Sequence, residues 1–501
     1  MMLQQKSKPM PQRSYLSDAN KNLWLSLVFG LIAAVIGIFS GFLIFKLENP
    51  ILAIAGAVAL IFAVISFTNL EFGLFVLIFM AYTRTSDILV QFHHFPSIAK
   101  PYITLLVVAI LVKWVVERQV PEGWERAAIL VGAYGLVVFS SLLYAADFNY
   151  ALKAVLRFLK DGIIAIVIAI LIRDGKTLRG VIWALLIAGI FVGTISTYQG
   201  LSGNTSNIFG GFGQVSYRNI VGNTEGARLS GPVGDANFYA QSMLVLIPIA
   251  LNRFLKEKRW HLKALAGWAF LVTSLAVIFS YSRGAAVAIG VMAIFGMFYS
   301  PPRVTDVLIG ILLIILIVTF IPNPYIERLA TIPDILGGKK GALSDVSYRG
   351  RTSEVIAAWL MFVDHPLFGV GVENYPVFYQ SYSRKLGLDS RIEARQAHNL
   401  YLQVAAETGL AGILVFGWLL VSMVKGMLDA IKNLKNAGFI WYSDLILSFA
   451  SGVIGYLAAA LFIHGAYPRY LWLLAGISLA IPRIAEDILK NATPKQDLYG
   501  I

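Results

Sequence analysis

The 501-residue chain contains no cysteine, and only 14% of its residues are charged. The missing cysteine excludes disulfides, thiolate metal ligands and a cysteine nucleophile. A soluble globular domain has about a quarter charged residues and about half apolar residues. This chain has fewer charged residues than that, and 57% of its residues are hydrophobic. The few charges and the high hydrophobic content together predict an integral membrane protein.

Several motifs of catalysis and transport are also missing. The chain has no GxxxxGK[ST] loop of an ATP-driven pump, no HExxH zinc site, no GxSxG nucleophile and no Asp-x-Asp pair. We therefore expect neither a cofactor nor a bound metal. The net charge of +13 is dispersed between apolar segments and forms no basic stripe, so nucleic-acid binding is not expected.

Long apolar segments recur along the chain, many of them near the roughly 20 residues that cross a bilayer. They predict an all-α, polytopic transmembrane helix bundle of roughly 12 to 14 spans, with one long, partly helical outer loop. Whether 51–82 forms two full spans or a re-entrant pair is left open, because its apolar runs are short. Lys and Arg of the short connections gather on one side, as between Arg253 and Lys263, which predicts that both termini are cytoplasmic.

The apolar pattern divides the chain into seven expected segments. In order they are a cytoplasmic tail at 1–22, N-terminal transmembrane helices at 23–199, an outer loop at 200–236, central transmembrane helices at 237–321, a long outer loop at 322–397, C-terminal transmembrane helices at 398–484 and a cytoplasmic tail at 485–501. Loops as long as 322–397 are usually functional or disordered. Within it, Thr352 precedes apolar residues at helical spacing, which predicts a helix capped by that threonine.

The segment Gln396–Gly409 joins the long loop to a very apolar helix. Its Asn399, Gln403 and Glu407 recur every four residues, so they lie on one helix face. Polar groups at the edge of a membrane helix need a partner or a role. The positive end of the helix dipole and nearby arginines disfavour imidazolium, so His398 is expected to be neutral, as a general base must be. The alternative is a hydrogen-bonded structural histidine.

Arginines lie beside glycines and aromatic residues in the segments assigned to the outer face. A guanidinium group holds phosphate through two parallel hydrogen bonds, so converging arginines would suit a lipid-linked diphosphate. The alternative is that some of them extend to the membrane surface or pair with acids such as Asp235 and Glu354. The candidate arginines are Arg84, Arg228, Arg283, Arg349 and Arg351.

The order of these motifs resembles the O-antigen ligase and polymerase family of bacterial envelope enzymes. The matching blocks are RLSGPVGDANFYAQ, YSRGA, RGR, HPLFGVGVENY and AHNLYLQVAAETGL, within roughly residues 190–420. The resemblance implies a GT-C-like, metal-independent, inverting glycosyltransferase of the bacterial cytoplasmic membrane. Its partners would be membrane lipids, a glycan donor linked to undecaprenyl diphosphate, and an acceptor hydroxyl on lipid A core, a growing polysaccharide or a protein, met at the outer face.

The resemblance also assigns roles by motif position. The catalytic histidine of the family falls on His398. The residues expected to bind the donor diphosphate are Arg283, Arg349 or Arg351, Arg228 as a fainter match, and Arg84 for its outer position. The residues expected to support them are Asn399, Tyr401, Glu407 and Asn374. No metal ligands are expected.

Two alternatives remain open at this stage. A polymerase shares its motifs with a ligase, so the acceptor is not determined. A small-anion transporter of the bicarbonate type is a different class of protein, and it predicts broken helices with paired ionisable groups at mid-membrane. The polar clusters of this chain lie instead near the outer ends of the predicted spans.

The predicted orientation is testable because the chain has no native cysteine. Single cysteines at Gly341 and Ser390 should react with a membrane-impermeant thiol reagent in intact cells, since both lie in the long loop. A cysteine at Lys258 should react only after the membrane is opened, because it lies in the basic inner connection. The reverse labelling pattern would invert the topology and favour the transporter.

Overall fold

The computed structural model describes residues 50–118, 123–221, 224–301, 304–332, 346–387, 395–465 and 469–491. The tail predicted at 1–22, the first part of the transmembrane segment predicted at 23–199, and positions Gly341 and Ser390 lie outside these residues. The chain divides into two compact units, residues 1–73 and residues 74–501. The first unit contains α2 (Pro50–Thr68) and the start of α3 (Leu70–Thr83).

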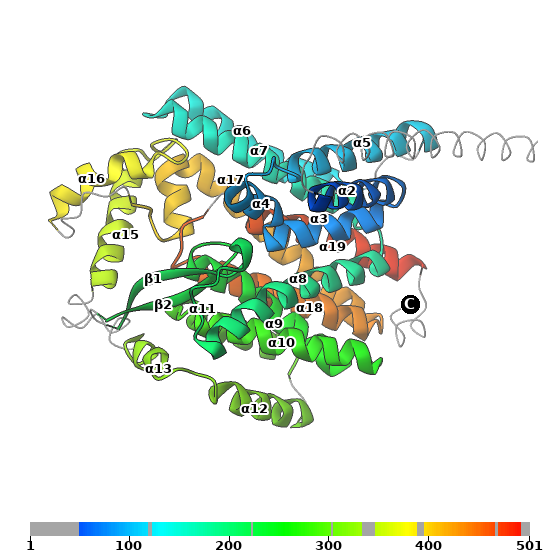
Figure 1. The fold of residues 1–501 in the computed structure, drawn as a ribbon. Helices are drawn as coiled ribbons and strands as arrows, with labels where there is room; N and C mark the ends of the chain where they lie inside the picture. The colour runs from blue at the N-terminus through cyan, green and yellow to red at the C-terminus, as the bar shows by residue number, and fades with distance from the viewer. Residues whose placement is uncertain are drawn as a thin grey trace, which may run out of the picture. The chain divides into compact units, whose positions relative to one another are not determined.

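The second unit is built almost entirely from helices, which confirms the all-α, multi-pass class (Figure 1). Its first half contains α4 (Thr85–His93), α5 (Ala99–Glu117), α6 (Glu125–Ser140), η1 (Ser141–Leu143), α7 (Phe148–Leu171), α8 (Gly175–Ser202), η2 (Phe209–Gly211), α9 (Ala236–Lys256), α10 (Trp260–Phe279) and α11 (Arg283–Tyr299). Its second half contains α12 (Val304–Val318), α13 (Asn323–Ala330), α15 (Val346–Asp364), α16 (Tyr375–Leu386), α17 (Leu400–Asn436), α18 (Ile440–Ala459) and α19 (Arg469–Asn491).

Seven helices in the described part of the chain are long and apolar enough to cross a membrane. The number rises to nine if each of two bent helix pairs is one span. One of these pairs is α3 with α4, bent by 52°. The α7 and α19 helices are as long as the spans but carry several charged residues, which bear on the site described below.

Aspartates define where several helices begin. The Asp147 carboxylate accepts hydrogen bonds from the backbone N–H groups of Asn149 and Tyr150 at the start of α7. Asp174 caps α8, and Asp235 caps α9 in the same way. An N-cap carboxylate satisfies backbone donors that have no partner within the helix. These caps explain why the spans begin at these points.

The connection at 200–236 contains a hairpin that its Gly-, Asn- and Ser-rich composition did not predict. Strands β1 (Gln214–Val221) and β2 (Thr224–Gly231) pair antiparallel. Leu229 of β2 joins a buried apolar cluster with Leu275 and Phe279 of α10 and Tyr325 of α13. The hairpin therefore lies against the ends of membrane helices and is part of the packed structure.

The long loop at 322–397 is partly helical, as predicted, and contains α13, α15 and α16. The capping role expected for Thr352 is wrong, because α15 already begins at Val346 and Thr352 lies inside it. Tyrosines hold α16 to α15: the Tyr375 hydroxyl donates to the backbone carbonyl of Glu354 at 2.6 Å. Both helices lie at the end of the bundle where the β1–β2 hairpin is found (Figure 1).

The α17 helix is broken at Gly409, whose backbone angles (φ 61°, ψ −157°) are not helical. At this break the chain segment 366–371 binds backbone to backbone. Val370 N–H donates to the carbonyl of Ala406, and Leu410 N–H donates to the carbonyl of Pro366, at 2.9 and 2.7 Å. A Cβ atom at Gly409 would lie 2.5 Å from the Leu367 carbonyl carbon. Glycine is therefore required here by both conformation and space.

We expect Gly409→Ala to destabilise the protein by at least 1–3 kcal/mol, the approximate cost of a strained backbone, before the clash is added. Gly417→Ala is the matched control, because a Cβ atom there has no neighbour within 4 Å. That control should be neutral or slightly stabilising, since alanine favours a helix by about 1 kcal/mol over glycine. Thermal unfolding of the purified proteins in detergent measures both. Equal unfolding temperatures for the two variants would contradict the proposed role of the break.

Candidate functional site

His398 lies immediately before the N-terminus of α17 in a left-handed backbone conformation, with φ of 47°. This region is uncommon for residues other than glycine and marks a position held by its surroundings. The next residue, Asn399, is the N-cap of α17 and accepts from the N–H groups of Tyr401 and Leu402, both at 3.0 Å. The cap fixes the point where the chain enters the helix, and with it the position of the histidine ring.

A buried carboxylate from α15 contacts the His398 ring. Nδ1 of His398 lies 2.8 Å from Oε2 of Glu354 and 3.0 Å from the carbonyl oxygen of Gln396. The hydrogen-bond geometry is met toward the carbonyl, and the carboxylate lies beside it. Both neighbours are acceptors, so Nδ1 must carry the proton. In the neutral ring, Nε2 then has the free electron pair.

Glu354 itself is fully buried and is held on its other side by an arginine. Its Oε1 lies 2.7 Å from Nε of Arg395. Burial alone would raise the pKa of this carboxyl. The contact with His398 and the charge of Arg395 outweigh burial, and the pKa of Glu354 is lowered below its ordinary value. The group that orients His398 is therefore an anion at neutral pH.

His398 lines a cavity of about 370 Å³ together with two of the predicted arginines, Arg283 and Arg351. We call it the arginine cavity. Among the described residues, none that lines this cavity is acidic. The remaining ones are mostly apolar: Gly284, Val287, Ile332, Thr352, Val355, Ile356, Leu461 and Phe462. The first turn of α11, which contains Arg283, adds the positive end of its helix dipole. The arrangement suits an anionic group attached to an apolar chain.

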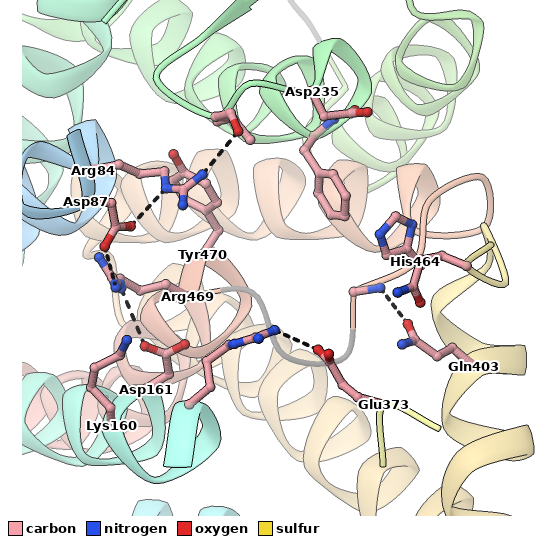
Figure 2. A pocket seen from close by; sticks show the side chains of 15 residues that line it. Arg84, Asp87, Lys160, Asp161, Asp235, Glu373, Gln403, His464, Arg469 and Tyr470 are labelled. Carbon is pink, nitrogen blue, oxygen red and sulfur yellow. Dashed lines mark hydrogen bonds and ion pairs between the residues drawn. The ribbon is translucent and has the colours of Figure 1, made fainter. Parts of the chain in front are cut away.

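A second cavity of about 580 Å³, here called the polar cavity, lies between α4, α7, the start of α9 and the start of α19 (Figure 2). Its basic lining residues are Arg84, Arg157, Lys160 and Arg469. Its acidic lining residues are Asp87, Asp161, Asp235 and Glu373. Figure 2 shows Arg469 between Asp87 and Asp161, at 3.3 and 3.4 Å, with Lys160 beside them. Three charged residues of α7 and the first residue of α19 thus line this cavity.

Two histidine rings connect the cavities. His464, in the connection between α18 and α19, lines the polar cavity. Its ring meets the ring of His398 edge to face, with centroids 5.2 Å apart. It also meets Phe238 of α9 at 4.9 Å. The sequence alone left His464 undecided, and the structure places it next to His398.

The polar face predicted on α17 contacts the end of α18. Asn399 donates to the carbonyl of Leu461 at 3.1 Å, and the Tyr401 hydroxyl donates to that of Leu457 at 2.8 Å. Gln403 donates to Glu407 at 3.3 Å and accepts from the backbone N–H of Gly465 at 2.8 Å. These bonds hold the His464 connection against the N-terminus of α17. Asn399, Tyr401 and Glu407 lie at or beside this contact, and their role in supporting the site stays a prediction.

Four other residues that the sequence predicted for the site are not found beside His398. Three lie elsewhere, and the side chain of the fourth is not among the described residues. Asn374 bonds to the backbone of Asp147 and fastens the long loop to α7. Arg228 donates to the carbonyl of Ser280 and lines neither cavity. Arg84 lines the polar cavity and pairs with Asp87 at 3.0 Å. The side chain of Arg349 lies outside the described residues.

Glu354 and Arg395 were not identified as site residues from the sequence. Glu354 was considered only as a possible partner of an arginine, and it does pair with Arg395. The available signal was its position three residues after Arg351, because residues three apart share a face where both are helical. That signal does not say that a histidine 44 positions later meets the carboxylate, at 2.8 Å.

The comparisons with known proteins agree with part of this picture. Residues 268–417 match the family model described as O-antigen ligase. The matched region contains Arg283, Arg351, Glu354 and His398, that is, the arginine cavity and the group that orients its histidine. The resemblance noted from the motifs is confirmed over this region. No curated protein matches the chain.

Proposed function

We propose that this chain, which carries the O-antigen ligase family domain at residues 268–417, moves a glycan from undecaprenyl diphosphate to an acceptor hydroxyl at the outer face of the bacterial cytoplasmic membrane. The family match and the membrane-spanning helices support a glycosyltransferase of the O-antigen ligase and polymerase type. The observation that carries the finer proposal is the arginine cavity, in which His398, Arg283 and Arg351 meet.

The arginine cavity has the chemistry that a lipid diphosphate requires. Two guanidinium groups offer paired donors to phosphate oxygens, and no acidic residue among the described lining opposes them. The apolar residues around them suit the first isoprene units of the lipid. Because diphosphate is already a good leaving group, neutralising its charge contributes more than protonating it.

His398 then has one task in the reaction. The acceptor hydroxyl oxygen attacks the anomeric carbon of the donor sugar, and the bond from that carbon to the diphosphate oxygen breaks. The electron pair leaves with undecaprenyl diphosphate, and the hydroxyl proton passes to Nε2 of His398. Direct displacement of this kind inverts the anomeric centre. The Glu354 carboxylate favours the tautomer in which Nδ1 carries the proton and Nε2 does not. Its negative charge also stabilises the imidazolium that forms when Nε2 takes the proton.

His398→Ala should reduce glycan transfer by about 10²–10⁴-fold, the usual contribution of a general base. Glu354→Gln should also reduce it, because an amide can donate to Nδ1 and favour the tautomer with Nε2 protonated. His365→Ala is the control, since His365 is an exposed histidine that lines neither cavity. Transfer is measured with membranes that contain the lipid-linked glycan. Near wild-type turnover by folded His398→Ala protein would exclude this mechanism.

Arg283→Ala and Arg351→Ala should weaken the binding of undecaprenyl diphosphate to the purified protein. Lysine at either position should restore binding only in part, because a single ammonium group cannot reproduce the two parallel hydrogen bonds of arginine. Native mass spectrometry or thermophoresis measures the affinity. Full restoration by lysine at both positions would mean that the cavity supplies only unspecific positive charge.

A further inference from the structure

The polar cavity is distinct in charge from the arginine cavity. Among the described residues that line it, four are basic and four are acidic, so their charges balance, and three of the acids are already paired with arginines. Arg157 meets Glu373 at 2.6 Å, and Arg469 lies between Asp87 and Asp161. A charge-balanced site has no net attraction for a diphosphate. It does offer many closely spaced donors and acceptors, which is what a molecule rich in hydroxyl groups needs.

Two polar atoms of residues that line this cavity are buried without a hydrogen-bond partner in the described structure. They are Nδ1 of His464 and Oε1 of Gln396. A buried polar group without a partner costs free energy, so such groups are rare unless a role requires them. Both residues are also neighbours of His398: the His464 ring contacts its ring, and the Gln396 carbonyl contacts its Nδ1.

His464 is suited to hold a hydroxyl group and unsuited to take its proton. Burial lowers the pKa of His464 most, a positive charge on the neighbouring His398 would lower it further, and the value is about 3. The ring therefore stays neutral, with one nitrogen as donor and the other as acceptor. His398 differs, because Glu354 contacts its Nδ1 and would stabilise a positive charge.

We propose that the polar cavity binds the terminal sugar of the acceptor, and that His464 positions the reactive hydroxyl of this sugar beside His398. This inference rests on the proposed glycan transfer. His464 gains and loses no proton in the step; the proton passes from the hydroxyl to His398, as described above. The donor sugar is covalently joined to the diphosphate and so stays with the arginine cavity. The polar cavity approaches His398 from the side of His464. The attacking hydroxyl would therefore reach His398 by a path separate from the arginine cavity, where the donor lies.

The test uses the full-length protein in detergent, with lipid-linked glycan from host membranes as donor and the host's own glycan acceptor, each varied in turn. His464→Phe keeps the aromatic contacts with Phe238 and His398 but removes both nitrogens. It should raise the KM for the acceptor about tenfold, the effect of losing one good hydrogen bond. The KM for the donor and the affinity for undecaprenyl diphosphate should not change. His464→Gln, which retains a donor and an acceptor, should recover part of the loss.

A second variant tests the cavity without touching the histidines. Lys160 lines the polar cavity and makes no ion pair with any described residue, so Lys160→Met keeps its length and removes its charge. Like His464→Phe, this variant should raise the KM for the acceptor. Lys153→Met is the matched control, because Lys153 lies two turns earlier on α7, is exposed, and does not line the cavity.

The outcomes separate the two proposals. A raised donor KM or weakened undecaprenyl diphosphate binding in these variants, with the acceptor KM unchanged, would assign the polar cavity to the donor glycan and overturn the inference. Unchanged kinetics in both variants would also overturn it. Absence of transfer and of undecaprenyl diphosphate binding in the wild-type protein would instead overturn the proposed function itself.

Discussion

The contact between the buried Glu354 carboxylate and His398 is the interaction on which the site depends. A carboxylate taken out of water is costly unless charged or hydrogen-bonding partners surround it. Glu354 is fully buried, and its two oxygens meet Arg395 and His398 at 2.7 and 2.8 Å. Any displacement of α15 from the start of α17 would leave that charge without partners. The carboxylate thus joins the long loop to the membrane helix and sets the tautomer of the histidine.

The backbone contact at the break in α17 supports the same joint from the other side. Gly369 and Gly409 let the segment 366–371 approach the helix so closely that carbonyl and N–H groups bond directly. A helix that stops hydrogen-bonding to itself must find other partners for these groups, above all near a membrane. The HPLFGVG segment supplies them. Loop, broken helix and histidine therefore form one rigid corner, which a reaction centre requires.

The two cavities differ in charge, as do the donor and the acceptor proposed for them. The arginine cavity combines basic and apolar groups, whereas the polar cavity combines equal numbers of basic and acidic groups. His398 and His464 stand edge to face between them. In the reaction proposed above, the diphosphate of the donor and the hydroxyl of the acceptor stay apart until they meet at one base. The arginine cavity and the polar cavity differ in charge and lie on either side of the His398 and His464 rings, which would provide such a separation.

Local patterns in the sequence were enough to predict the helical class and most of the helices. The transmembrane segments predicted at 23–199 and 237–321 contain α7, α8 and α10, because a stretch of apolar residues has few stable choices in a bilayer. The glycines and the polar edge of α17 were visible as motifs, and His398 followed from its place at a helix start. The β1–β2 hairpin was missed, because its strands lack a regular alternation of apolar residues.

The tertiary structure decided which polar residues share a cavity. Five arginines had similar local surroundings in the sequence, yet Arg283 and Arg351 lie at His398, Arg84 lies in the other cavity and Arg228 braces the hairpin. The meeting of Glu354 with His398, and of His398 with His464, joins three segments far apart along the chain. Periodicity reports only which face of its own helix a residue occupies. Which faces meet depends on how helices and loop pack against one another, and no local pattern in the sequence encodes that.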